Sequence, residues 1–230
     1  MDENFSLDQY DKAFKRAVEK LEELYNEYEK HDEKYLREQI YLEYKKLKLD
    51  PDGKAVRKRA GVKCTADGMH SAYRICKMEP DKSNIISTYE KYRKCPIFYF
   101  PSEVGGINTS RNSVYGDRID YTLYDLKLAL EGKSDECRLN DAYKKPKTAK
   151  WLASFNNDFK ELVNWYGIQG IFTDDDYNVL NIETGKAIEK EKQGEIPELE
   201  YFSHGWSRDY YENLKEKIDA WYKKQGIGKE

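Results

Sequence analysis

The stretch "INTSRNSVYGDRIDYTL", residues 107–123, decides how the chain is interpreted, because a buried strand is expected to meet a helix there. It gathers amide, guanidinium and carboxylate side chains just before a helical pattern that begins near residue 120. A helix N-terminus favours anions through its free N–H groups and its dipole. Arginines bind phosphate or carboxylate groups with two parallel hydrogen bonds. The candidate ligand-binding residues are Asn108, Arg111, Asp117, Arg118 and Asp120.

The same side chains have a second interpretation, which we favour. The two arginines can pair with Asp117 and Asp120 and hold the segment against the preceding strand, while Asp120 also caps the helix. No His, Cys or Lys lies in the segment, so acid–base catalysis there would need a carboxyl group with a shifted pKa. We therefore predict no catalytic residues, and the sequence favours a protein that is not an enzyme.

Helical patterns dominate on both sides of this stretch. Apolar side chains recur at helical spacing in residues 6–30 and again in residues 207–224. The apolar run "CPIFYFP", residues 95–101, predicts a short buried strand. Further helices are expected at residues 33–49, 120–131 and 148–166, and a strand, a turn and a hairpin at residues 170–188. The predicted fold class is a mainly helical α+β protein with a small sheet.

We expect two domains. Residues 1–90 would form a helical N-terminal region, made of a helix hairpin and a basic segment. Residues 91–230 would form an α+β core that ends in the C-terminal helix. Within that core, residues 189–200 are rich in Glu and contain a proline, which predicts an exposed linker.

The basic segment "KAVRKRAGVKC" begins at residue 54 and contains no acidic residue. Such a cluster can bind the phosphate groups of a nucleic acid, an acidic protein or another polyanion. Part of it, "RAGVKCT", faintly resembles the turn of a helix-turn-helix, although Gly68 follows where a helix should continue. A solvated basic surface without a partner is the alternative that we favour. The candidate patch consists of Lys54, Arg57, Lys58, Arg59 and Lys63.

Composition narrows the class of protein. The 230 residues carry a net charge of −3, so no overall basic field indicates nucleic-acid binding. Aromatic residues make up 14% of the chain, which predicts a folded core rather than disorder. The N-terminus lacks an apolar signal segment, and no stretch approaches the roughly 20 apolar residues of a membrane span. We expect a cytoplasmic protein without membrane contact.

No metal or cofactor site is predicted. The four cysteines, at positions 64, 76, 95 and 137, include no closely spaced pair of the kind that zinc sites use, so free thiols are expected. The three histidines lie far apart in the sequence. The acidic run "TDDDYN", residues 173–178, lacks the glycine and distal glutamate of a calcium loop and predicts a plain turn. No phosphate-binding or dinucleotide-binding glycine motif occurs.

The central part of the chain resembles a bacterial family that is described only as a domain of unknown function. Members of that family carry Phe-Pro after a buried strand, then Asn-x-x-Arg, then Asp-Arg-x-Asp-x-Thr-Leu leading into a helix that ends at a glycine. The resemblance covers about residues 95–180. The matching residues are Phe100, Pro101, Asn108, Arg111, Asp117, Arg118, Asp120, Thr122, Leu123 and Gly132.

This chain also departs from the family pattern. The family has a Gly and an Asn-Pro between the Arg and the Asp-Arg, and this chain is about two residues shorter there. Tyr124 stands where the family tends to have a Glu. The resemblance implies no known activity, but it makes residues 107–123 the segment to examine first.

Three interpretations of function remain. The leading one is a non-enzymatic binding or accessory protein of a phage or mobile element, which acts on host defence machinery through protein contacts. Its basis is the abundance of Tyr and Trp, which suit interfaces, and the lack of catalytic motifs. The first alternative is an enzyme or sensor that binds a nucleotide or another phosphate compound at residues 108–120. The second alternative is nucleic-acid binding through the basic patch at residues 54–63.

Overall fold

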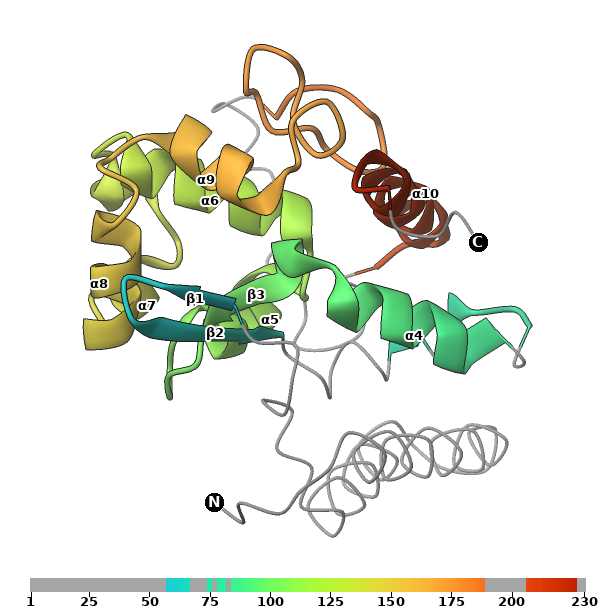
Figure 1. Cartoon of the computed structure of the whole chain (residues 1–230), viewed down its shortest axis with the longest axis horizontal. Coiled ribbons are helices and arrows are strands. Elements are labelled where there is room, and N and C mark those ends of the chain that lie inside the picture. The colour runs from blue at the N-terminus through green and yellow to red at the C-terminus, as the bar shows by residue number, and fades with distance from the viewer. Residues whose placement is uncertain (1–56, 67–73, 76–77, 82–83, 189–205, 227–230) are drawn as a thin grey trace, which may run out of the picture. The chain divides into compact units, whose positions relative to one another are not determined.

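The structure is a computed structural model that describes residues 57–66, 74–75, 78–81, 84–188 and 206–226 (Figure 1). The helices predicted at residues 6–30 and 33–49, the predicted linker at residues 189–200 and Lys54 lie outside the described residues. The chain divides into two compact units, residues 1–56 with 66–94 and residues 57–65 with 95–230. The predicted division into two domains near residue 90 stays a prediction.

In the first unit, the structure describes one long helix, α4 (Ile85–Lys94). Tyr89 and Tyr92 lie on consecutive turns of this helix, and both side chains are buried. Helical spacing of large aromatic rings gives α4 one apolar face. The residues of the predicted ligand site all belong to the second unit.

The sheet of the second unit has three strands, β1 (Arg57–Arg59), β2 (Val62–Ala66) and β3 (Tyr99–Pro101), in the order β1-β2-β3. β1 and β2 are antiparallel, with Arg59 opposite Val62. The two residues of the connecting turn, Ala60 and Gly61, have φ angles of 50° and 75°. This left-handed pair is the conformation of tight two-residue hairpins. The likeness of these residues to a helix-turn-helix is therefore wrong, since they form a β-hairpin.

Helices are the main regular structure of the second unit. They are α5 (Ile107–Tyr115), α6 (Ile119–Leu130), α7 (Asn140–Tyr143), α8 (Pro146–Ala153), α9 (Phe159–Tyr166) and α10 (Arg208–Lys224), with short 3-10 turns η3 (Pro96–Phe98) and η4 (Ser134–Glu136). Helices around a small sheet confirm the predicted fold class, a mainly helical α+β protein. In the described part of the chain, no helix is both long and apolar enough to cross a membrane.

Four predicted elements differ from the structure. Residues 170–188, where a strand was expected, contain isolated β-bridges and no strand. The single helix expected at residues 148–166 is two helices, because Asn156 and Asn157 have φ angles of 54° and 56° and interrupt the helical backbone. Asp158 then caps α9, and its side chain accepts a hydrogen bond from the Lys160 N–H over 2.8 Å. The predicted strand at residues 95–101 is a strand only in β3, since η3 occupies its first half. Residues 107–115, expected as a connection, form α5.

The core of the second unit is aromatic. The Trp151 ring packs edge-on against Phe155, with 5.0 Å between ring centroids, and against Phe100 of β3, with 6.4 Å. Tyr166 at the end of α9 also packs on Phe100, and its hydroxyl donates to the Tyr99 carbonyl over 2.8 Å. These contacts join β3, α8 and α9 around one centre.

Candidate functional site

The connection between α5 and α6 is a left-handed turn. Gly116 and Asp117 have φ angles of 55° and 63°. Glycine adopts this conformation at no steric cost, whereas for Asp117 it is uncommon and needs support from its surroundings. That support comes from Arg111, whose Nη1 donates to the Asp117 carbonyl over 3.1 Å and whose Nη2 lies 3.5 Å from the Asp117 carboxylate. Both side chains are fully buried.

Asn108 belongs to the first turn of α5 and faces the sheet. Its Nδ2 donates to the carbonyl of Thr65 in β2 over 3.0 Å. The residue is only partly buried, and within the described residues its Oδ1 accepts no hydrogen bond. Asn108 therefore ties α5 to β2 and is the member of the predicted set that is least enclosed.

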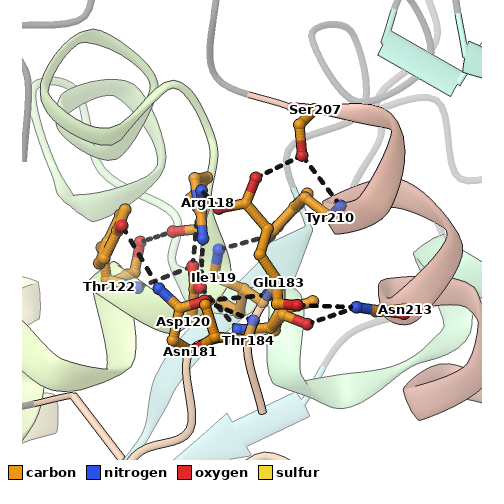
Figure 2. Close-up of polar contacts among 12 residues, drawn as sticks. Arg118, Ile119, Asp120, Thr122, Asn181, Glu183, Thr184, Ser207, Tyr210 and Asn213 are labelled. Atoms are coloured by element: carbon orange, nitrogen blue, oxygen red, sulfur yellow. Dashed lines mark hydrogen bonds and ion pairs between the residues drawn. The ribbon is translucent and has the colours of Figure 1, made fainter. Parts of the chain in front are cut away.

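Arg118 is the centre of a second set of contacts, shown in Figure 2. Its Nε and Nη2 bind the two carboxylate oxygens of Asp120 over 3.2 Å and 2.7 Å. Its Nη1 donates to Glu183 over 2.5 Å. The guanidinium group also lies 4.3 Å and 4.5 Å from the ring centroids of Tyr121 and Tyr210. We call these five residues the Arg118 cluster.

The electrostatics of the Arg118 cluster follow from these contacts. Burial alone would lower the pKa of the Arg118 guanidinium, but the Asp120 carboxylate raises it well above its ordinary value. Burial alone would raise the pKa of Glu183, and the hydrogen bonds from Ser207 and Arg118 lower it instead. Arg118 and Glu183 are therefore both held in their charged forms at neutral pH.

Asp120 connects α6 to the turn at residues 181–184. Besides Arg118, its oxygens accept hydrogen bonds from the N–H groups of Tyr121 and Ile182, each over 3.0 Å. The prediction that Asp120 caps α6 is wrong, because Arg118 occupies the N-cap position and Asp120 lies within the first turn. The Asp120 carboxylate therefore links α6 to the 181–184 turn and does not cap the helix.

The N-terminus of α10 completes the arrangement (Figure 2). Ser207 caps this helix by accepting the Tyr210 N–H over 3.0 Å, and its hydroxyl donates to Glu183. The Tyr210 hydroxyl accepts the Ile119 N–H over 2.9 Å. On the next turn, Asn213 donates to the Ile182 carbonyl over 2.9 Å. The Arg118 cluster thus fastens α6, the 181–184 turn and α10 to one another.

A further buried carboxylate, at Asp125 of α6, was not predicted. It accepts the hydroxyl groups of Tyr115 and Tyr143 over 2.6 Å and 2.5 Å, and the N–H groups of Arg138 and Leu139 over 2.7 Å and 3.4 Å. Burial raises the pKa of Asp125, although these four donors lower it in part. One signal in the sequence pointed to it, an Asp between Leu123 and Leu126 on an apolar helix.

The side chains of the candidate basic patch do not share one environment. Lys58 is exposed, and Lys63 is partly buried. Arg59 turns toward α8, where its Nε and Nη2 donate to the hydroxyl and carbonyl of Ser154 over 2.9 Å and 2.8 Å. Its guanidinium also lies 4.0 Å from the Phe155 ring centroid. Arg57 takes part in β1 through its backbone, and its side chain is not among those described.

The acidic run at residues 173–178 forms a turn, as predicted. The Asp174 carboxylate accepts the backbone and side-chain N–H groups of Asn178 over 2.7 Å and 3.0 Å. Burial alone would raise the pKa of Asp174, but these hydrogen bonds lower it. Across the described residues, no group of three or more His, Cys, Asp or Glu side chains is placed to hold a metal ion.

At both arginines, Arg111 and Arg118, the described contacts hold segments of this chain together. The ion pairs Arg111–Asp117 and Arg118–Asp120 are those of the favoured sequence interpretation. A ligand site at residues 108–120 stays a prediction. No protein-family model, curated protein or solved structure matches this chain. The resemblance of residues 95–180 to a domain of unknown function likewise stays a prediction.

Proposed function

We propose that this chain is a non-enzymatic binding protein, which acts by holding another macromolecule rather than by converting a small molecule. The observation that supports this proposal is the use of the Arg118 cluster. All three guanidinium nitrogens of Arg118 contact carboxylates of the same chain, and the group lies 4.3 Å and 4.5 Å from the ring centroids of Tyr121 and Tyr210. An arginine that binds a phosphate ligand needs some of these donors for the ligand.

The second arginine supports the same proposal. Arg111 is fully buried, and its contacts hold the left-handed residue Asp117 in place. A residue that fixes a strained backbone in this way contributes to the rigidity of the unit. The rigid unit would present its surface to a partner. The expected protein partner, the phage or mobile-element origin and the action on host defence stay predictions from the sequence.

Thermal unfolding of the full chain in the presence of ATP, ADP, AMP or inorganic phosphate tests the proposal. A ligand at about 100 times its dissociation constant would add about 2.7 kcal/mol to the free energy of unfolding, which is a shift of several degrees. We expect no such shift from a site at residues 108–120. The matched variant is Asn108→Ala, which removes the least enclosed side chain of the predicted set.

The outcomes separate the two candidate functions. A stabilising shift that disappears in Asn108→Ala, while the variant keeps the circular dichroism spectrum of the unaltered chain, would place a small-molecule site there and overturn the proposal. Unchanged unfolding temperatures with every compound would support a protein that binds macromolecules instead.

A further inference from the structure

Lysines from separate segments meet around the closed end of the β1–β2 hairpin. A β-carbon placed on Gly61, in the hairpin turn, would lie 3.9 Å from Nζ of Lys150 in α8. A β-carbon on Gly105, in the loop after β3, would lie 3.7 Å from Nζ of Lys145. In Figure 1 the hairpin turn lies beside α8. We call the following set the lysine surface: Lys58, Lys63, Lys144, Lys145, Lys147 and Lys150.

The positive charge of the lysine surface is incompletely compensated. Lys58, Lys145 and Lys150 are exposed, and no carboxylate of the described residues pairs with their ammonium groups. One nearby acid, Glu103, attracts the ammonium group of Lys147. Glu103 accepts the N–H groups of Lys147 and Thr148 at the start of α8, over 3.1 Å and 3.0 Å. A local excess of positive charge therefore exists on a chain whose net charge is −3.

Two further acids near the hairpin are also engaged. Asp141 lies 3.4 Å from Nζ of Lys144, and Glu161 lies 3.9 Å from Arg59. Both of these ion pairs are on the surface, where pairs of this kind are weak. They reduce the net charge at Lys144 and Arg59, whereas no carboxylate of the described residues pairs with Lys58, Lys145 or Lys150.

The chemistry of the lysine surface fits phosphate groups. Lysine is a flexible point charge that binds the phosphate groups of nucleic acid, and such contacts carry no sequence information. Arg59 is the arginine of the hairpin whose side chain is described, and it is turned toward Ser154 and Phe155 instead. Binding without base-edge contacts would follow shape and charge rather than sequence.

Among the side chains whose burial is described, no aromatic one is exposed, and this favours one form of nucleic acid. Proteins that bind single strands stack the bases on exposed aromatic side chains. Within the described ranges, the one large apolar residue that is exposed is Val104, at 95%, in the loop beside Lys145. We infer that the lysine surface binds the phosphate backbone of double-stranded nucleic acid. This inference rests on the proposed function and names the class of its partner.

The test measures binding of the full chain to a short fluorescent duplex by anisotropy, over a series of salt concentrations. The variant Lys58→Gln/Lys145→Gln/Lys150→Gln removes three charges from the lysine surface. The control Lys133→Gln/Lys186→Gln/Lys223→Gln removes the same charge from exposed positions on other elements. If each of the three lysines contacts one phosphate, the slope of log K against log salt becomes smaller by about 2.7 in the first variant only.

We also expect the first variant to bind the duplex about 10-fold or more weakly at low salt, and the control to bind as the unaltered chain does. Equal loss in both triple variants would overturn the inference. So would tighter binding to a single strand of the same length, or no duplex binding by the unaltered chain at low salt. In the last two cases the thermal test above still decides the proposed function, so the two failures are distinguishable.

Discussion

At the scale of single residues, Arg118 shows how a buried charge is kept in a protein. Taking a guanidinium group out of water is costly, and attraction to a carboxylate offsets that cost only when the geometry is good. Here the Asp120 carboxylate meets the guanidinium with two hydrogen bonds, and Glu183 provides a third. Each partner is therefore stable in the interior only while the other is present.

Replacing Arg118 by Met should lower the free energy of unfolding by about 3–5 kcal/mol, because Asp120 would remain buried without its counter-charge. Urea denaturation followed by circular dichroism measures this change. Arg118→Lys should recover little of the loss, since an ammonium group cannot make the paired hydrogen bonds. Arg208→Met is the control, because Arg208 forms a surface ion pair with Glu212 and should matter by less than about 1 kcal/mol. A similarly small effect at Arg118 would contradict the assigned role.

Asp125 should give an unusual dependence of stability on pH. Burial raises its pKa in the folded state above the unfolded value of about 3.9. Its contribution to stability is then fully present below pH of about 3.9 and is lost as the pH rises through the folded pKa. The difference in unfolding free energy between the unaltered chain and Asp125→Asn should fall as the pH rises across this range, which urea denaturation at a series of pH values measures.

Asp174 is a control for Asp125, because its pKa is shifted in the opposite direction. Hydrogen bonds from Asn178 lower its pKa, against the effect of burial. Its contribution is present above the unfolded pKa of about 3.9 and is lost as the pH falls through the lower folded value. The difference between the unaltered chain and Asp174→Asn should therefore grow as the pH rises. Slopes of the same sign for the two substitutions would contradict the pKa directions assigned here.

At the scale of elements, periodicity predicted the helices whose buried faces are apolar. α6 and α10 begin within one residue of their expected starts, and glycines follow or end helices at Gly132 and Gly167 as expected. α5 was not predicted, because its buried face includes Arg111 and Asn112 and therefore lacks the apolar spacing that indicates a helix. The β1–β2 hairpin was not predicted for a similar reason, since its first strand reads Arg-Lys-Arg.

The turn of the β1–β2 hairpin can be made more stable by substitution. Ala60 has a φ of 50°, a left-handed conformation that costs Ala more free energy than it costs Asn, Asp or Gly. Asn-Gly is the preferred pair for this turn. Ala60→Asn should raise the free energy of unfolding by about 1 kcal/mol, measured by urea denaturation. Gly61→Ala, at a φ of 75°, should lower it by a similar amount. A loss of stability in Ala60→Asn would contradict the assigned turn.

At the scale of the second unit, contacts between distant segments determine what local patterns could not. The sequence placed Arg118 close to Asp120, and their pairing was the favoured interpretation. Glu183 and Tyr210, the other partners of Arg118, lie far along the chain and reach it only through the tertiary fold. Propensity and spacing describe neighbours within an element, so they contain no information about such partners.

The last helix should unfold together with the rest of this unit. Trp221 donates to the Tyr166 carbonyl over 2.9 Å, and Leu214 is buried on the same face of α10. Leu214→Ala should lower the free energy of unfolding by about 2–5 kcal/mol. Lys223→Ala, at an exposed position on the same helix, should change it by less than about 0.5 kcal/mol.

Tryptophan fluorescence and circular dichroism should report the same denaturation midpoint in each of these two variants, as expected for one cooperative unit. Two separate transitions in Leu214→Ala would show that α10 unfolds on its own.

The alkylation rates of the buried cysteines can report the local opening of this unit. Cys64, Cys95 and Cys137 lie in three different segments, each enclosed by the protein. Burial raises the pKa of the Cys95 and Cys137 thiols to about 12, and only the thiolate reacts with alkylating reagents. Alkylation at each position therefore has to wait for its segment to open. In a chain with Cys76 replaced by Ser, the rates at the three sulfur atoms would rank the order in which the hairpin, the start of η3 and the end of η4 come apart.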